Sequence, residues 1–137
     1  MRYTLDANSI SAIISDNIFI KNRVEISLLS GDTITVNAIS YYEVKRGLLC
    51  KDTKNQLINF IKLCREHDII IMDKISIFDK ASEIYARLGE KKEIGDCDIL
   101  IASIACIGDF TLVTNNIRHF NIIRESTKEL NVENWLN

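Results

Sequence analysis

Apolar residues along this chain recur with two spacings, one typical of strands and one typical of helices. In residues 33–38, the apolar Ile34, Val36 and Ala38 alternate with polar residues, which is the two-residue period of a strand. In residues 53–66, apolar side chains recur at helical spacing, at Leu57, Phe60, Ile61 and Cys64. This second spacing predicts a helix that lays one apolar stripe against a sheet.

The two spacings follow one another along the chain. Strands are predicted over residues 2–5, 33–38, 69–72, 110–113 and 130–135, the last at an edge of the sheet. Helices are predicted from Asn8 to about Leu29, with a break near Asp16, and from a start after Ser40. Further helices are predicted over 53–66, from Ser76 to Leu88 and over 98–107, with a short helical turn over 116–120. Strands that alternate with helices form a mostly parallel sheet covered on both faces, with right-handed crossovers. The predicted fold class is therefore α/β, with a sheet of about five strands.

Capping residues indicate where the helices are expected to begin. Asn8 is expected to cap the first helix, because its side chain can accept a hydrogen bond from a free backbone N–H. Two pairs fit the capping-box pattern, Ser40 with Glu43 and Ser76 with Asp79. The helix that starts at Ser76 has one apolar face, predicted to hold Ala81, Ile84, Tyr85 and Leu88.

Composition supports one compact domain. With 137 residues, 47% of them hydrophobic, the chain can build one continuous core. It has no proline, no linker rich in glycine and serine and no internal repeat, so a single domain over residues 1–137 is expected. No apolar run approaches the roughly 18 residues that span a bilayer, and the N-terminus has no signal-peptide pattern. We therefore expect a soluble, cytoplasmic protein without a membrane partner.

The cysteines show no pattern of a zinc site or a disulfide framework. There is no C-x-x-C pair, and no histidine pair at a matching spacing. We expect reduced and mostly buried side chains at Cys50, Cys64, Cys97 and Cys106.

The net charge of −2 argues against a protein held to nucleic acid by a general excess of positive charge. It does not exclude an RNA enzyme, because acids gathered in one metal site leave the rest of the surface close to neutral. The local pairs Lys45–Arg46 and Lys91–Lys92 could then meet phosphates, although such pairs are more often ordinary solvated surface.

Acidic and amide side chains fall where predicted strands end or where the next helices begin. Asp6 follows the first strand, and Glu43 lies in the first turn of the helix after the second. Asp96 and Asp98 open the buried helix, and Asn116 follows the fourth strand. In an open parallel sheet, ligands bind outside the carboxyl ends of the strands. The sequence therefore predicts that distant segments bring polar groups to one edge of the sheet.

Each acid also has a purely structural interpretation. Asp6 could simply end its strand, and Glu43 could only complete the capping box. Asp96 could be an N-cap, and Asp98 could be favoured by roughly 0.3 to 1 kcal/mol at the positive end of a helix. These alternatives stay open for each residue taken alone.

Taken together, the acids favour a metal site. Two carboxylates about 4.5 Å apart repel by roughly 3 to 4 kcal/mol at an effective dielectric near 20, so a chain does not gather three without compensation. A divalent cation provides it, and Mg²⁺ and Mn²⁺ prefer oxygen ligands. Mg²⁺ also keeps several waters, which leaves positions for a phosphate and an attacking water. Such a site suits phosphodiester hydrolysis.

Four segments in this order and spacing resemble one known family over nearly the whole chain. They are Tyr3–Asn8, Ser40–Val44 with Gly47, Ile94–Ala102, and Leu112–Asn116 with Phe120. In these residues the chain resembles the PIN-domain ribonucleases and, within them, the VapC toxins of bacterial toxin–antitoxin pairs.

The resemblance implies a three-layer α/β/α domain that cleaves RNA with Mg²⁺ or Mn²⁺. By position, Asp6 and Asp98 look like the metal ligands, and Glu43 looks like the acid that orients or deprotonates the attacking water. Asp96 would assist from two residues upstream. Asn116 is also assigned to the catalytic positions, and many members carry a fourth acid there. This departure puts a tightly held second metal in doubt, but not the activity.

The resemblance also implies partners: a cognate VapB-like antitoxin, an RNA substrate and a second copy in a homodimer. Tyr41, Tyr42 and the apolar positions of the helices around residues 10–29 and 41–64 are expected in the core, and some of them in a groove for the antitoxin tail. His119 could contact RNA or donate a proton, although a lone histidine is more often a surface residue.

Three other interpretations have cheap tests. A catalytically silent PIN scaffold acting as a binding module is disfavoured by the intact acids. A Toprim-like nuclease using Asp96 and Asp98 should carry them at the end of a strand, and a phosphotransfer receiver using Asp6 should have a lysine at the end of a late strand. The RNA itself is not encoded in any motif, and transfer RNA is the leading expectation because several related toxins cut it.

Overall fold

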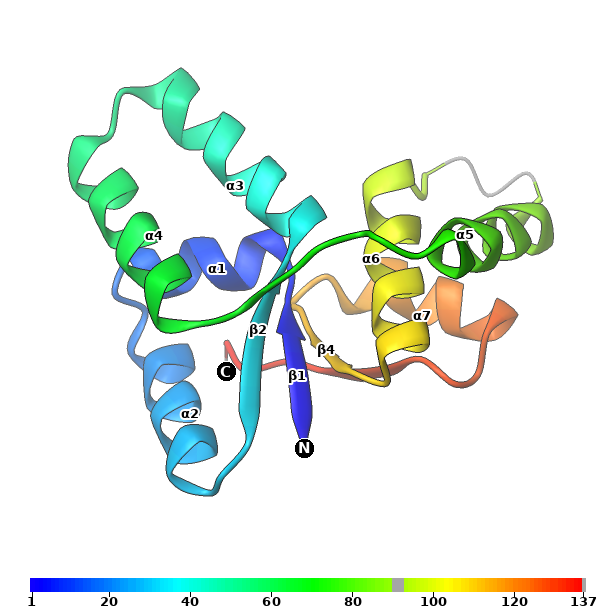
Figure 1. Cartoon of the computed structure of the whole chain (residues 1–137), viewed down its shortest axis with the longest axis horizontal. Coiled ribbons are helices and arrows are strands. Elements are labelled where there is room, and N and C mark those ends of the chain that lie inside the picture. Colours follow the sequence, from blue (N-terminus) through cyan, green and yellow to red (C-terminus); the bar gives the residue numbers. More distant parts are fainter. Residues whose placement is uncertain (90–92, 137) are drawn as a thin grey trace.

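A parallel sheet lies at the centre of the molecule (Figure 1). The computed structural model describes residues 1–89 and 93–136, and the Lys91–Lys92 pair lies outside them. Within this part the strands are β1 (Arg2–Leu5), β2 (Thr33–Asn37), β3 (Ile69–Ile70), β4 (Thr111–Val113) and β5 (Asn131–Glu133). Their order is β3-β2-β1-β4-β5, and every neighbouring pair is parallel. The predicted α/β class and the edge position of the last strand are confirmed.

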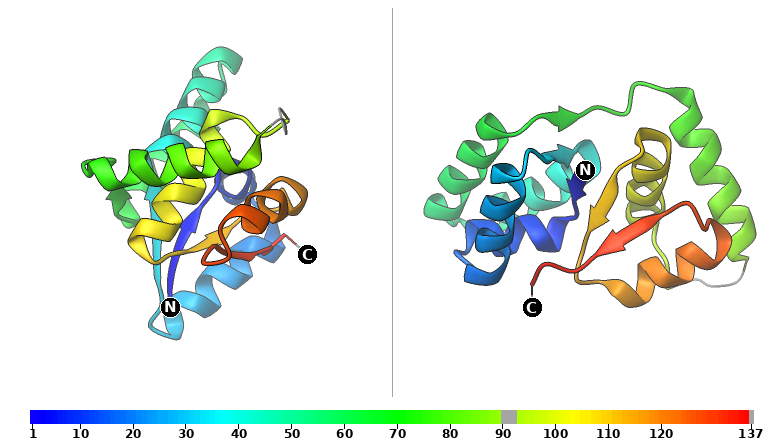
Figure 2. Two further views of the ribbon diagram at one scale, coloured as in Figure 1. Left: turned by 90° about the vertical axis from the view of Figure 1, so that its right-hand side faces the viewer. Right: turned by 90° about the horizontal axis from the view of Figure 1, so that it is seen from below.

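Helices formed by the described residues cover both faces of the sheet. They are α1 (Ala7–Ile14), α2 (Ile18–Leu29), α3 (Ala38–Lys51), α4 (Lys54–Glu66), α5 (Ile75–Leu88), α6 (Asp96–Gly108) and α7 (Ile117–Ser126). Helices α1–α4 cover one face and α5–α7 the other, which the two further views also show (Figure 2). The expected three-layer α/β/α arrangement is present.

Each face of the sheet has its own hydrophobic core, because successive side chains of a strand point to opposite faces. On the α1–α4 side, Leu5 and Val36 pack in one cluster with Ile10 and Phe60. On the α5–α7 side, Leu112 packs in a second cluster with Ile84, Ile101, Phe120 and Ile123. All of these side chains are buried, so both helical layers are fixed to the sheet.

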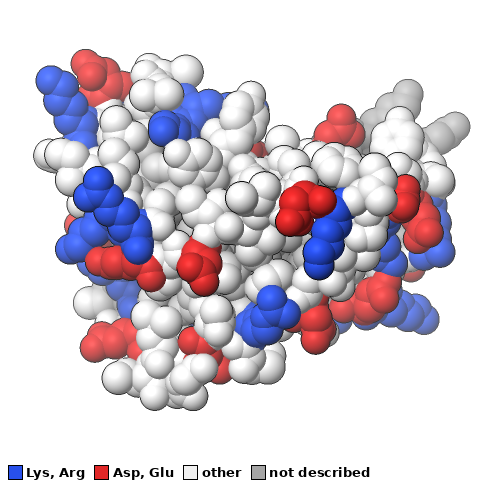
Figure 3. Space-filling view, in the orientation of Figure 1, with Lys and Arg blue, Asp and Glu red and all other residues white. Residues whose placement is uncertain are grey.

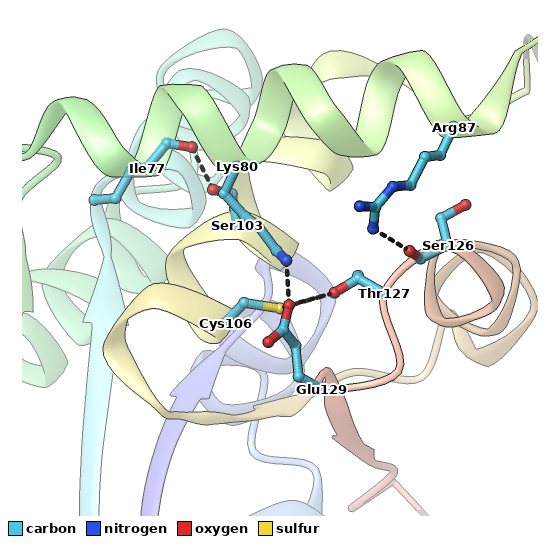
Figure 4. A network of polar contacts seen from close by, with 8 residues as sticks. All are labelled: Ile77, Lys80, Arg87, Ser103, Cys106, Ser126, Thr127 and Glu129. Atoms are coloured by element: carbon cyan, nitrogen blue, oxygen red, sulfur yellow. Dashed lines mark hydrogen bonds and ion pairs between the residues drawn. The ribbon is translucent and has the colours of Figure 1, made fainter.

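Polar contacts tie α5 to the segment around the end of α7 (Figure 4). Lys80 forms an ion pair with Glu129, whose carboxylate also accepts a hydrogen bond from the Thr127 hydroxyl at 2.9 Å. Arg87 donates to the Ser126 carbonyl at 2.9 Å. Lys80 and then Thr127 hold the pKa of Glu129 below its usual range. This network fixes one side of the α5–α7 layer.

Two predicted helix starts are wrong, because the side chains at the strand ends take the capping positions. Asp6, not Asn8, caps α1 and accepts a hydrogen bond from the Ser9 N–H at 2.8 Å. Asn37 caps α3 and accepts from the Ser40 N–H at 2.8 Å. Ser40 therefore lies inside the helix, and the capping box that would pair it with Glu43 does not form.

Helix α5 also differs from its prediction. It begins at Ile75, so Ser76 is already helical, and the preceding Lys74 makes no side-chain cap. The predicted capping box of Ser76 with Asp79 is therefore wrong. The side chain of Tyr85 is 64% exposed rather than part of the apolar face, because the neighbouring Ile84 takes the position that points into the core.

Other segments differ in length or burial. β3 has two residues rather than four, and α7 continues to Ser126 because the buried Phe120 and Ile123 keep the helical spacing beyond the predicted turn. Tyr42 is exposed rather than in the core. The cysteines are free as expected, but Cys50 is exposed and the other three are half-buried. No helix formed by the described residues is both long and apolar enough to cross a membrane.

The strands that follow β1 in the sequence lie on both sides of it in the sheet. β2 and β3 lie on one side of it, and β4 and β5 lie on the other. The switch falls between β1 and β4, whose last residues Leu5 and Val113 pair in register. Open parallel sheets bind ligands outside the carboxyl ends of their strands at such a switch point. The residues that follow Leu5 and Val113 are therefore the first candidates for a functional site.

Candidate active site

Asp6 is the first residue after β1 and lies at the switch point. Its backbone N–H donates to the Val113 carbonyl at 3.0 Å, which carries the β1–β4 pairing one step beyond β1. Its carboxylate accepts hydrogen bonds from the Ser9 N–H at 2.8 Å and from the Thr114 hydroxyl. With 5% of the residue exposed, Asp6 is held in one orientation. Asp6 is a helix cap, but each carboxylate oxygen can accept a further interaction.

Thr114 belongs to the site, although it was not among the predicted site residues of the Leu112–Asn116 segment. It follows β4 as Asp6 follows β1, and it is fully buried. Its hydroxyl donates to Asp6 and accepts a hydrogen bond from the Asn116 N–H at 2.9 Å. One side chain thus links the switch point to the start of α7. The available signal in the sequence was a threonine directly after a strand that is buried on both faces.

Glu43 reaches the same region from α3. It lies in the second turn rather than the predicted first turn, because α3 begins at Ala38. Its side chain is 22% exposed, and one carboxylate oxygen lies 4.0 Å from Arg46 Nη2. The structural interpretation of Glu43 as part of a capping box is excluded, which leaves this half-buried acid without a role in helix capping.

Burial and mutual repulsion shift the pKa values of the acids. Burial raises the pKa of Asp6, the hydrogen bonds that its carboxylate accepts oppose this shift, and the charge of Asp98 adds to it. Burial also raises the pKa of Glu43, the charges of Asp98 and Asp6 add to the shift, and Arg46 opposes it. The structure therefore brings Asp6, Glu43 and Asp98 into one electrostatic cluster.

Asp98 is paired with His119. It lies in the first turn of α6, where a carboxylate is favoured by the positive end of the helix. Its Oδ2 lies 3.1 Å from His119 Nδ1, and the two side chains are 24% and 28% exposed. His119 is therefore not a plain surface residue, because it lies in the first turn of α7, which packs against α6, and so faces Asp98.

The remaining predicted positions lie at the border of the cluster. Asp96 is exposed and is the first residue of α6, while Gly95 takes the N-cap position. Asn116 is half-buried before α7, and its side chain forms no capping hydrogen bond. Among residues 1–89 and 93–136, no three His, Cys, Asp or Glu side chains already form a metal-binding group. The described acids are close enough to shift one another's pKa values, but they do not form a complete set of metal ligands.

Two of the alternative enzyme classes do not fit this geometry. The acid pair of a Toprim-like nuclease would end a strand, whereas Asp96 and Asp98 open α6, which follows α5. A receiver would place a lysine directly after a late strand, whereas Thr114 and Asn115 follow β4. The acid cluster at the switch point therefore fits neither of these two enzyme classes.

A family model described as the PIN domain matches residues 3–125, which include every site residue named above. The chain belongs to the PIN-domain family. A curated relative, ribonuclease VapC2 of Rickettsia felis, is 33% identical over 144 residues, with 98% of this chain and 98% of the relative covered. Within the PIN-domain family, the chain therefore falls in the VapC group.

Solved structures of other PIN-domain proteins have the same fold. The crystal structure of VapBC2 from Rickettsia felis, bound to a DNA fragment from its promoter, matches with a TM-score of 0.84 and 29% identity over 98% of this chain and 99% of that one. The structure of VapBC-1 from nontypeable Haemophilus influenzae matches with a TM-score of 0.80 and 23% identity, with both chains fully covered. The second match shows the shared fold alone.

Proposed function

We propose that this PIN-domain protein is the ribonuclease toxin of a VapBC-type toxin–antitoxin pair and that it hydrolyses RNA phosphodiesters with Mg²⁺ or Mn²⁺. The observation that carries the proposal is the cluster of Asp6, Glu43 and Asp98 at the switch point, where burial and then repulsion from Asp98 raise the pKa of Asp6 and of Glu43. A divalent cation would relieve this repulsion. When bound, it would supply a Lewis acid and an activated water for hydrolysis.

Asp6 and Asp98 would hold the cation. Asp6 is fixed by Ser9 and Thr114, yet both of its oxygens keep acceptor capacity. The Asp98 side chain is partly exposed and can present an oxygen beside the one that faces His119. Mg²⁺ typically uses one or two carboxylates and several waters, whereas Zn²⁺ usually requires three or four protein ligands. A two-carboxylate site without a closed cage therefore fits Mg²⁺ or Mn²⁺.

Glu43 would orient or deprotonate the attacking water. Burial, followed by the charge of Asp98, raises the pKa of Glu43 above its ordinary value, which makes its carboxylate a stronger base. Asn116 would contact the RNA or a ligand water as a neutral amide, next to the Thr114 hydroxyl that binds its N–H. His119 would hold Asp98 in place through the contact between Nδ1 and Oδ2.

The protein partner would be a VapB-like antitoxin. Helix α2 exposes apolar side chains that a partner could cover, and Ile18 and Leu29 are 65% and 82% exposed. They border a groove that Val24 and Leu28 also line. An amphipathic helix could bury its apolar face there, and a basic tail could meet the acid cluster. Homodimer formation, a cytoplasmic location and tRNA as the substrate stay predictions from the family resemblance.

A cleavage assay tests the proposal. Purified protein should cut RNA in Mg²⁺ or Mn²⁺ and stop in excess EDTA, because carboxylates alone cannot neutralise the transition state. Co-expression of the neighbouring open reading frame should yield a complex that no longer cuts. Undiminished cleavage in EDTA would overturn the metal mechanism. If the folded protein cuts nothing with either metal, the chain is a catalytically silent scaffold. Sequencing of the 5′ ends formed in cells would identify the RNA.

A further inference from the structure

Tyr42 and Arg46 form an exposed pair on α3 beside Glu43. The two residues are four positions apart, so their side chains are neighbours on the helix surface. Arg46 Cζ lies 4.9 Å from the centre of the Tyr42 ring. Tyr42 is 56% exposed and the Arg46 side chain is 53% exposed, so neither side chain is part of the core. The pair therefore presents a tyrosine ring and the guanidinium that lies over it to solvent.

This surface lies next to the acid cluster. Arg46 Nη2 is 4.0 Å from Glu43 Oε2. Of the charged groups in the described residues that shift the pKa of Glu43, Arg46 is the cation, and the other two are the acids Asp98 and Asp6. RNA that approaches three carboxylates is repelled through its phosphates, so a cation at this border favours its entry. In the space-filling view, acidic and basic groups are interspersed, without one large basic patch (Figure 3).

A second arginine on an aromatic ring shows what a structural pair looks like in this protein. Arg23 lies over the Trp135 ring with 5.4 Å to its centre, and its guanidinium is 3.9 Å from Glu133. Trp135 is 4% exposed, so its ring is used in packing and offers no free face. Tyr42 also has an arginine over its ring, but more than half of its surface is exposed.

We propose that Tyr42 and Arg46 form a stacking platform for one unpaired RNA base next to the scissile phosphate. The inference rests on the proposed ribonuclease function and assigns Tyr42 and Arg46 to the binding of one base of the RNA. Bases of single-stranded RNA stack on tyrosine rings and on guanidinium planes, whereas a base inside a duplex cannot reach them without unpairing. The platform therefore selects loops and single strands.

Binding of a fluorescent RNA measures the platform directly. The probe is an oligoribonucleotide that spans the cleavage site, with 2-aminopurine on either side of the scissile bond, mixed with the full chain in EDTA so that no cut occurs. The parent should quench 2-aminopurine by stacking. Tyr42→Ala should lose the quenching and bind between about 5-fold and about 150-fold more weakly, the range expected for one stacked base. Tyr42→Phe should retain both properties, and Arg46→Ala should weaken binding.

Arg23→Ala is the matched control and should bind RNA as the parent does. With Mn²⁺, Tyr42→Ala should raise KM while kcat changes little, because the platform contacts a base and not the reacting phosphate. Equal quenching and equal affinity in the parent and Tyr42→Ala would overturn the platform even if both cut RNA. Equal weakening by Arg23→Ala would overturn it as well, since loss of positive charge alone would then explain the effect. A parent that neither binds nor cuts RNA would instead refute the proposed function.

Discussion

Replacing Thr114 by valine tests how Asp6 is held in place. Valine has nearly the shape of threonine, so Thr114→Val removes the hydroxyl that donates to the Asp6 carboxylate and leaves almost no cavity. Thr114 is fully buried and Asp6 is 5% exposed, so water cannot replace the donor. A hydrogen bond to a charged group contributes about 1.5 to 3 kcal/mol. We expect the free energy of unfolding at neutral pH to fall by about 2 kcal/mol.

The size of this loss should depend on pH. Burial raises the pKa of Asp6 and the hydrogen bond from Thr114 opposes that shift, so Thr114→Val should raise the pKa further. An acid with a raised pKa in the folded state destabilises the fold when it is ionised. The penalty is present above the raised pKa and disappears as the pH falls below the unfolded value of about 3.9. The stabilities of the parent and Thr114→Val should therefore approach each other in acid, apart from a loss independent of pH because the Asn116 N–H loses its acceptor.

Urea unfolding of the metal-free proteins, followed by circular dichroism at several pH values, measures this convergence. Thr114→Ser is the matched control, because it keeps the hydroxyl and loses only a methyl group. It should retain the pH dependence of the parent. Cleavage by Thr114→Val should fall about 10- to 100-fold if Asp6 is the proposed metal ligand, as expected when a residue that positions such a ligand is lost. A stability loss of the same size at every pH would refute the role of Thr114 as the donor that holds ionised Asp6.

Three further predictions concern other charged groups. Glu43→Gln should lower kcat by at least about 100-fold, the contribution of a general base, without destabilising the metal-free fold; retained kcat would exclude that role. Asp98→Asn should abolish cleavage and gain much less thermal stability from Mn²⁺ than the parent, and a destabilised but active variant would exclude Asp98 as a ligand. The lowered pKa of Glu129 stabilises the fold above its unfolded pKa, and this contribution is lost as the pH falls through the folded value. Glu129→Gln should therefore make the free energy of unfolding depend less on pH between those two pKa values.

The order of strands and helices could be predicted from the sequence, but the helix caps could not. The periods of two and 3.6 residues are local properties of the sequence, so they can be recognised without knowledge of the fold. Asn8 and Ser40 are good capping residues, yet Asp6 and Asn37 take those positions. The choice depends on where each strand stops, and the strand end at Asp6 is set by pairing with β4 from the far end of the chain.

The same distinction applies to the candidate site. The acids could be predicted because parallel strands end at one edge: Asp6 follows β1, Asp98 lies in the first turn of α6, and Glu43 lies early in the helix after β2. The contact between Thr114 and Asp6 joins residues 108 positions apart, and nothing local in the sequence indicates it. His119 meets Asp98 because α7 packs against α6, and this packing between helices could not be predicted from the local sequence.

The capping role of Asp6 affects how an inactive form of this toxin should be made. Production of a toxin in cells usually requires such a form, and a proposed metal ligand is the obvious position to change. Asp6→Ala would leave the Ser9 N–H and the Thr114 hydroxyl without their acceptor inside the protein, so reduced toxicity could reflect a smaller amount of folded protein. Glu43 caps no helix, and its side chain is partly exposed. Glu43→Gln should therefore give the inactive protein whose folded yield matches the parent, which makes it the better form for capturing an antitoxin.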